Sequence, residues 1–172
     1  MERAGREVFP RIFKMMEQAF PPAETRDRQG QESLFDHPAY RLYVSRDQTG
    51  QIQGFIAAWE FEDFRFVEHL AVDAAVRGGG QGGAMMREYL GRDPRPVVLE
   101  VEPPLGEMAR RRIGFYERLG FALNRFDYRQ LPLRKGDGPM PLLVMSWPQP
   151  VTEQAFAPYK RTIYREVYGQ SK

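Results

Sequence analysis

The chain of 172 residues contains no cysteine and only two histidines, His37 and His69. The absence of cysteine excludes disulfides, a thiol nucleophile and cysteine-based zinc sites, and it is typical of proteins from reducing compartments. Two histidines without cysteine do not complete a conventional zinc site, so we expect no bound metal. The composition alone therefore excludes catalysis by a cysteine thiol and disfavours a zinc-dependent reaction.

A strong charge of one sign and long apolar segments are also missing. Lys and Arg total 25, of which only four are Lys, against 23 Asp and Glu, so the net charge is +2. A charge this close to balance gives no field for non-specific nucleic-acid binding. No run approaches the roughly 20 apolar residues that cross a membrane, and the N-terminus lacks the apolar stretch of a signal peptide. We therefore expect a cytoplasmic protein that binds neither nucleic acid nor membrane.

Hydrophobic patterning and turn residues predict an alternation of helices and strands along one domain, residues 1–172. The core is expected over about 1–148, with a C-terminal helical extension over about 149–172. Helices are predicted over 6–20, 31–35, 81–90 and 107–119, with the C-terminal helix starting near Tyr159 because of Pro158. Strands are predicted over 40–45, 52–60, 64–72, 97–102, 121–130 and 142–147. This order mixes hairpins with crossovers, which predicts the α+β class with a mixed sheet.

Five glycines fall within residues 78–83, between a predicted strand and a predicted helix. Such a loop lets backbone N–H groups and the positive helix end bind an anion, most naturally a phosphate. A P-loop is excluded because Ala84 and Met85 follow Gly83 where that motif needs Lys and Ser or Thr. The dinucleotide fingerprint Gly-x-Gly-x-x-Gly does match, but four residues separate the strand from Arg77 where that motif needs a tight turn.

A third interpretation of the glycine loop accounts for more residues than the P-loop or the dinucleotide fingerprint does. Residues 77–82, Arg-Gly-Gly-Gly-Gln-Gly, resemble the Arg/Gln-x-x-Gly-x-Gly/Ala signature of the GNAT acetyltransferase superfamily, and residues 115–121, Phe-Tyr-Glu-Arg-Leu-Gly-Phe, resemble its second motif. The resemblance covers about residues 40–130 and implies the GNAT fold, a central mixed and mostly antiparallel sheet flanked by helices. It also implies an N-acetyltransferase that moves an acetyl group from acetyl-CoA directly to a primary amine of a small, cationic acceptor. Two alternatives stay open: a non-catalytic acyl-CoA-binding sensor or partner domain, and a protein or peptide acetyltransferase.

The resemblance implies that acetyl-CoA binds through its pyrophosphate to the glycine loop and through its pantetheine to the preceding strand, with the N–H of Val72 polarising the thioester carbonyl. The residues implied are Leu70, Val72, Arg77, Gly78, Gly79, Gly80, Gln81, Gly82, Gly83, Arg112 and Phe115. For Arg77 the alternative is a solvated loop cation, and for the arginines at 110–112 it is pairing with Glu107.

Two residues are implied for catalysis. An alkylammonium with a pKa near 10.4 must lose a proton before attack, and the superfamily often places a base at the position of Glu68. Strand alternation puts Glu68 on the same face as Leu70 and Val72, and His69 on the other, where a structural role is expected. The alternative for Glu68 is that it fixes substrate or pairs with an arginine. Tyr116 is implied as the proton donor to the leaving thiolate, with an ordinary core tyrosine as its alternative.

The acceptor site is expected among acidic and aromatic residues. Glu100 and Glu102 share one strand face, which would attract a cation, although an ordinary exposed face is an equal alternative. Glu24 lies in a region that often contacts acceptor in this superfamily. Tyr128 and the C-terminal tyrosines 159, 164 and 168 could line the acceptor cleft or the interface of a homodimer.

Overall fold

The computed structural model describes residues 1–169, and these residues form two compact units that are considered separately below. The first unit contains Met1–Phe61 and Val67–Pro94. The second contains Glu62–Phe66 and the described residues from Arg95 onward. Within residues 1–169, no helix combines the length and hydropathy that a membrane crossing needs.

The first unit is built on strands joined mainly by hairpins. They are β1 (Glu2–Ala4), β2 (Tyr40–Arg46), β3 (Ile52–Glu60) and most of β4 (Arg65–Val72), in the order β1-β2-β3-β4. β2 is antiparallel to both β1 and β3. The β2–β3 hairpin closes where Gly50, with φ of +85°, donates its N–H to the carbonyl of Asp47. The predicted hairpin is therefore present, whereas the short strand β1 was not predicted.

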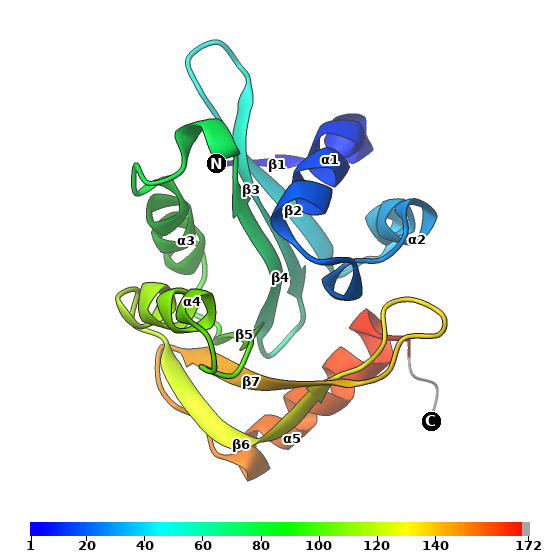
Figure 1. The fold of residues 1–172 in the computed structure, drawn as a ribbon, viewed down its shortest axis with the longest axis vertical. Helices are drawn as coiled ribbons and strands as arrows, with labels where there is room; N and C mark the ends of the chain where they lie inside the picture. Colours follow the sequence, from blue (N-terminus) through cyan, green and yellow to red (C-terminus); the bar gives the residue numbers. More distant parts are fainter. Residues whose placement is uncertain (170–172) are drawn as a thin grey trace. The chain divides into compact units, whose positions relative to one another are not determined.

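Helices cover both sides of these strands. They are α1 (Phe9–Ala19), α2 (Arg28–Ser33) and α3 (Gln81–Gly91), with short 3₁₀ turns η1 (Arg6–Val8), η2 (Pro22–Glu24), η3 (Leu34–Asp36) and η4 (Ala74–Val76). Figure 1 shows α1 and α2 on one side of β2–β4 and α3 on the other. The helix α1 ends because Phe20, the residue before Pro21, is extended, as proline disfavours a helical residue before it.

One glycine sets the spacing between α3 and the strands. A Cβ at Gly54 of β3 would lie 2.8 Å from Sδ of Met85 in α3 and 3.0 Å from the carbonyl oxygen of Ala71 in β4. Only a residue without a side chain allows the helix and the neighbouring strand to approach this closely. Near the start of the same helix, Gln81 Nε2 donates to Ser45 Oγ at 3.2 Å.

The second unit contains three antiparallel strands and the C-terminal helices. The strands are β5 (Val97–Val101), β6 (Ala122–Gln130) and β7 (Met140–Trp147), in the order β5-β7-β6. The helices are α4 (Glu107–Glu117), α5 (Glu153–Thr162) and a π-helical turn, η5 (Ile163–Val167). Figure 1 shows α4 and α5 on opposite sides of β6 and β7. The start of β4 belongs to this unit because the Arg65 N–H donates to the Pro96 carbonyl at 2.8 Å.

The predicted start of the C-terminal helix near Tyr159 is wrong. The helix begins at Glu153, where the Thr152 hydroxyl accepts from the Ala155 N–H at 3.1 Å, and Pro158 lies inside it. Proline inside a helix removes one backbone hydrogen bond. Burial of Phe156 against the rings of Phe126 and Tyr128 stabilises the longer helix and offsets that loss.

Candidate active site

The glycine loop has the backbone geometry that anion binding needs. Gly78 and Gly80 have φ of +89° and +75°, a region that side chains disfavour, and an added Cβ at either would meet no atom within 4 Å. Gly80 is the N-cap of α3, so the first N–H groups of this 11-residue helix have no partner within the helix. The open backbone and the positive helix end together fit a phosphate group.

The residues before the loop explain why no tight turn follows the strand. Asp73 caps the short turn η4 by accepting from the N–H of Ala75 at 2.9 Å, and Arg11 also binds its carboxylate. Arg77 is exposed, and its Nε donates to the carbonyl of Val72 at 3.2 Å. The tight turn that the dinucleotide motif needs after its strand is therefore absent. Instead, the Arg77 guanidinium is bound to the carbonyl of Val72 at the end of β4.

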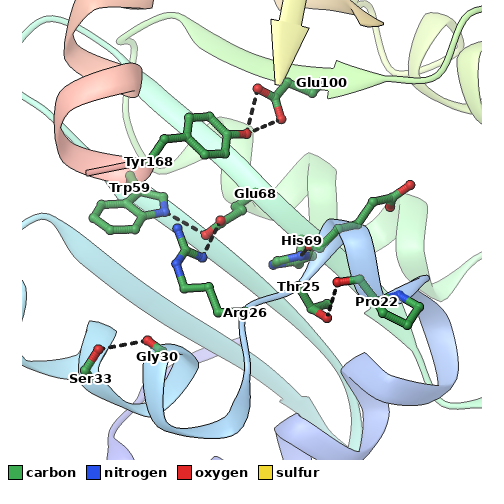
Figure 2. Close-up of polar contacts among 11 residues, drawn as sticks. Pro22, Thr25, Arg26, Gly30, Ser33, Trp59, Glu68, His69, Glu100 and Tyr168 are labelled. Carbon is green, nitrogen blue, oxygen red and sulfur yellow. Dashed lines mark hydrogen bonds and ion pairs between the residues drawn. The ribbon is translucent and has the colours of Figure 1, made fainter. Parts of the chain in front are cut away.

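Glu68 of β4 is buried in an ion pair (Figure 2). Its Oε1 accepts from Arg26 Nη1 at 2.6 Å and its Oε2 from Trp59 Nε1 at 2.8 Å, and the side chains of Glu68 and Arg26 are only 4% and 10% exposed. Burial alone would raise the pKa of Glu68, but the Arg26 guanidinium, His69 and the two hydrogen bonds outweigh it, so this pKa lies below its usual range. The structure thus shows the arginine pairing that the sequence left open, while a role as base stays a prediction.

Aromatic rings enclose this ion pair. The Trp59 ring lies 4.8 Å from His37 and 5.5 Å from Tyr40, measured between centroids, and the guanidinium carbon of Arg26 is 5.9 Å from its centroid. His69 is buried, as strand alternation predicts, with Nε2 2.7 Å from the backbone oxygen of Glu24. Arg26 and Trp59 were not predicted, because each meets Glu68 only through tertiary contact.

In the second unit, Tyr116 of α4 is buried between Phe115 and Phe121, whose rings lie 5.0 and 5.5 Å from its own. Burial, opposed by Arg112, raises the pKa of Tyr116 to about 12, so its phenol keeps the proton at neutral pH. The helix ends at Glu117, and Gly120, with φ of +90°, turns the chain so that the N–H of Phe121 donates to the Tyr116 carbonyl at 3.1 Å.

The arginines that open α4 differ in their contacts. Arg111 forms an exposed salt bridge with Glu107 at 2.7 Å, and Arg110 donates to the carbonyl of Pro104 at 3.3 Å. Arg112 is exposed on the same helix. The pairing alternative therefore holds for Arg111, and a cofactor contact by Arg112 stays a prediction.

Glu100 of β5 is held by tyrosine hydroxyls. Tyr128 donates to Oε1 at 2.5 Å. The hydroxyl of Tyr168 lies 2.8 and 2.7 Å from the two carboxylate oxygens, and Figure 2 shows this contact. Burial and then the Glu100 carboxylate raise the pKa of Tyr128. Glu102 is exposed, so the two acidic residues predicted for one face have different surroundings.

Other C-terminal side chains extend this tyrosine cluster. Tyr164 donates to the carbonyl of Arg129 at 2.6 Å, and Lys160 Nζ lies 5.5 Å from the Tyr164 ring centroid and 6.0 Å from that of Tyr128. The sequence marks the C-terminal tyrosines only as aromatic residues that could line a cleft or an interface, and a bond between Tyr168 and Glu100, 68 residues apart, leaves no local signal in the sequence. The ammonium of Lys160 therefore lies within cation–π range of the Tyr128 and Tyr164 rings, so these two rings already have a cationic partner within the protein.

Comparisons with known proteins define the class to which the chain belongs. A family model for the acetyltransferase (GNAT) domain matches residues 38–123, half of the chain. A solved structure from Bacteroides thetaiotaomicron, assigned to the GNAT family, is 31% identical, with a TM-score of 0.91 over 99% of this chain and 98% of that one. The chain therefore belongs to the GNAT acetyltransferase family, and the predicted family and α+β fold class are confirmed.

Two further comparisons are more distant. YjbC from Bacillus subtilis (strain 168), assigned to the acetyltransferases, is 29% identical over 111 residues, which are 63% of this chain and 55% of YjbC. This chain thus matches little more than half the length of that curated relative. A single-residue variant of the spermidine N-acetyltransferase SpeG from Vibrio cholerae is 14% identical, with a TM-score of 0.64 over 84% of this chain and 92% of that one. At this identity the likeness shows the fold alone.

The predicted site residues divide between the two units. The first unit carries Glu24, Glu68, Leu70, Val72, Arg77 and the loop 78–83, and the second carries Glu100, Glu102, Arg112, Phe115, Tyr116 and Tyr128. Within the first unit, nine residues separate Glu68 from Gly78, the first glycine of the loop. Within the second, the structure brings Glu100 and Tyr128 into hydrogen-bond contact.

Proposed function

We propose that the protein transfers an acetyl group from acetyl-CoA directly to the primary amine of a small, cationic acceptor. The observation that carries the proposal is the open glycine loop, with Gly78 and Gly80 at positive φ, which leads into α3 in a chain of the GNAT family. The Glu100 carboxylate of the second unit, which is held by tyrosine hydroxyls, supports the acceptor class.

The residues proposed to hold acetyl-CoA are those of the loop and its flanks. The N–H groups of 78–83 would bind the pyrophosphate, Arg77 would add a positive charge, and backbone groups of Leu70 and Val72 would bind the pantetheine and polarise the thioester carbonyl. Arg112 and Phe115 are proposed to complete the cofactor site. Acetyl-CoA supplies an acyl group activated as a thioester.

In the proposed reaction the neutral amine attacks the thioester carbonyl carbon, a C–N bond forms, the C–S bond breaks, and CoA leaves as a thiolate. Tyr116 is proposed to donate a hydrogen bond to that thiolate. Because its pKa is about 12 while that of a thiol is near 8.5, full proton transfer would be unfavourable, so stabilisation of the thiolate is the larger part of its role. The nitrogen then loses one proton to base or solvent, which leaves an amide with one N–H, and the CoA thiolate takes up a proton to leave as CoA.

The proposed role of Glu68 as the base depends on the opening of its ion pair. The side chains of Glu68 and Arg26 are almost fully buried, so Arg26 or Trp59 has to move aside before the acceptor can reach the carboxylate. If the pair stays closed, kcat/KM should rise about tenfold per pH unit between pH 6 and 8, as the neutral fraction of the amine grows. An inflection in that range that is lost in Glu68→Gln would show that the pair opens in the working enzyme, because only loss of the Arg26 charge would raise the pKa of the buried Glu68 so far.

The test is release of CoA thiol from acetyl-CoA over a panel of polyamines, amino acids, aminoglycosides and N-terminal peptides. Because the chain has no cysteine, a thiol reagent reads only the product. We expect turnover with one class of small cationic amine. Turnover with peptides alone would favour a peptide acetyltransferase. No turnover, with a melting temperature still raised by CoA, would favour the non-catalytic acyl-CoA-binding domain.

Removal of one hydroxyl tests the role of Tyr116. Tyr116→Phe should lower kcat about 100-fold with little change in the KM for acetyl-CoA, because the lost hydrogen bond acts on the leaving group. Tyr43→Phe is the matched control, since the Tyr43 hydroxyl donates to Glu60 at 2.8 Å and neither residue is proposed for the site. An unchanged kcat in Tyr116→Phe would remove Tyr116 from the mechanism.

A further inference from the structure

The first unit contains a cavity that the proposed acetyl transfer does not use. Its volume is about 420 Å³, and it lies among β1, η1, η3 and the start of β2. The lining residues are Arg3, Ala4, Gly5, Arg6, Phe35, Tyr40 and Leu42. None of them is among the residues proposed for acetyl-CoA, the acceptor or catalysis, and the volume lies in the range of small-molecule sites, about 300–1,000 Å³.

Apolar side chains form one part of the cavity wall. Leu42 and Tyr40 are buried, and the ring of Phe35 meets that of Tyr40 edge-on, with centroids 5.6 Å apart and planes at 84°. Burial and this ring contact hold both side chains in place, so the surface is formed before a ligand arrives. The half-buried ring of Phe35, supported from behind by Tyr40 and Leu42, offers the apolar surface on which one aromatic ring could pack.

Two guanidinium groups add positive charge to this apolar wall. Arg3 is exposed, and among residues 1–169 nothing forms a hydrogen bond or ion pair with its side chain. Arg6 binds the carboxylate of Asp36 at 2.8 Å, but both side chains are largely exposed, 49% and 73%. An exposed pair of this kind contributes at most about 1 kcal/mol, so a ligand can replace Asp36 at Arg6 with little loss.

We propose that this cavity is a second ligand site, for a small organic monoanion that carries a carboxylate on an apolar body. Arginine binds carboxylates in a bidentate, charge-assisted geometry, and Arg3 and Arg6 both line the cavity. The carboxylate binds the two guanidinium groups, and the apolar body packs on Phe35, Tyr40 and Leu42.

A ligand in this cavity would be detected by Trp59. The ring of Tyr40, which lines the cavity, lies 5.5 Å from that of Trp59, and the indole N–H of Trp59 donates to Glu68. The only other tryptophan is Trp147, in the second unit, so Trp147→Phe leaves Trp59 as the sole indole emitter. The site therefore lies two side chains from Glu68 through packed contacts.

The test is calorimetric titration of the full chain with benzoate, and with benzyl alcohol and benzylamine as neutral and cationic probes of similar shape. Acetyl-CoA is left out, so the result is independent of the proposed acetyl transfer. We expect one benzoate per chain, bound at least tenfold more tightly than either other probe. In the Trp147→Phe variant, benzoate should also change the emission of Trp59.

Substitutions of exposed side chains separate the site from non-specific binding. Arg3→Gln combined with Arg6→Gln should weaken benzoate binding at least tenfold, whereas Arg125→Gln, an exposed arginine of the second unit, should not change it. Asp36→Asn should tighten binding, because it removes the carboxylate that competes for Arg6. Equal binding of benzoate and benzyl alcohol, or no response to the double arginine variant, would overturn the proposal. An unchanged melting temperature in each variant confirms that the fold is intact.

Discussion

Glu68 and Glu100 are both strand carboxylates with hydrogen bonds to each of their oxygens, yet their donors differ (Figure 2). Glu68 receives a guanidinium and an indole N–H, and Glu100 receives two tyrosine hydroxyls. A guanidinium cancels the carboxylate charge, whereas a neutral hydroxyl satisfies the oxygen and leaves its charge in place. The first arrangement is suited to fixing structure, and the second is suited to attracting a cation.

The difference also bears on which carboxylate can exchange its partners. Separating Glu68 from Arg26 would leave two buried charges without compensation, which is costly. A hydroxyl rotates freely and can exchange one acceptor for another, so an ammonium can join or replace it at Glu100 at lower cost. We therefore expect changes at Glu68 to act first on stability and changes at Glu100 to act first on acceptor binding.

The largest effect should follow removal of the Glu68 charge. Glu68→Gln leaves Arg26 buried without its counter-ion and should destabilise the protein by about 3–5 kcal/mol in urea unfolding. Glu17→Gln, on the exposed surface of α1, should change stability by less than about 0.5 kcal/mol. Replacement of both partners, Glu68→Leu with Arg26→Met, should recover most of the loss, and a double variant as unstable as Glu68→Gln would contradict this account of the pair.

A smaller effect is expected at Tyr128. Tyr128→Phe removes a buried donor to an ionised carboxylate and should cost about 1.5–3 kcal/mol in the same unfolding measurement. Tyr168→Phe should cost less, because Tyr128 still donates to Glu100. If Tyr168→Phe is the more destabilising of the two, the C-terminal turn rather than β6 fixes the orientation of Glu100.

Neutralising Glu100 should affect acceptor binding more than turnover. Glu100→Gln should raise the KM for a cationic acceptor about tenfold, which corresponds to about 1.4 kcal/mol, with little change in the KM for acetyl-CoA. Glu62→Gln, an exposed acidic residue of the same unit, is the matched control. An unchanged acceptor KM in Glu100→Gln would show that the tyrosine cluster serves stability alone.

The smallest effect is on the pH dependence of stability. The pKa of Glu68 is lower in the folded protein than its ordinary 4.5, so its contribution is complete above about pH 4.5 and is lost as pH falls through the folded value. The slope from one such group is at most about 1.4 kcal/mol per pH unit. Urea unfolding between pH 6 and 3 should therefore show a steeper loss in the wild type than in Glu68→Gln, and parallel curves would contradict the lowered pKa.

Much of the fold could be predicted from the sequence because local signals specify it. The strand ahead of the glycine loop, the helix after it and the helix shortly before Gly120 were all predicted within a few residues of their observed bounds. The short strand β1 was missed because three residues carry no clear alternation. The start of α5 was missed because Pro158 suggests a helix start, while the stabilising contacts of Phe156 come from another element.

The candidate site was predictable only where motifs mark it. The glycine loop and Tyr116 lie in contiguous motifs with recognisable spacing, whereas Arg26 and Trp59 meet Glu68 across 42 and 9 residues. Strand alternation placed Glu68 and His69 on opposite faces but could not show which cation lies beside Glu68. The partners of buried charges depend on how distant segments pack, and periodicity in one segment carries no information on that packing.

The close contact at Gly54 links the height of α3 above the strands to the position of the glycine loop. The backbone of β3, with no side chain between, sets how far Met85 and the helix stand from the strands. A Cβ at position 54 would meet the end of the Met85 side chain, which can turn aside, and the carbonyl oxygen of Ala71, which cannot move without β4. A residue 24 positions before the glycine loop therefore contributes to the packing of the helix whose N-cap is Gly80.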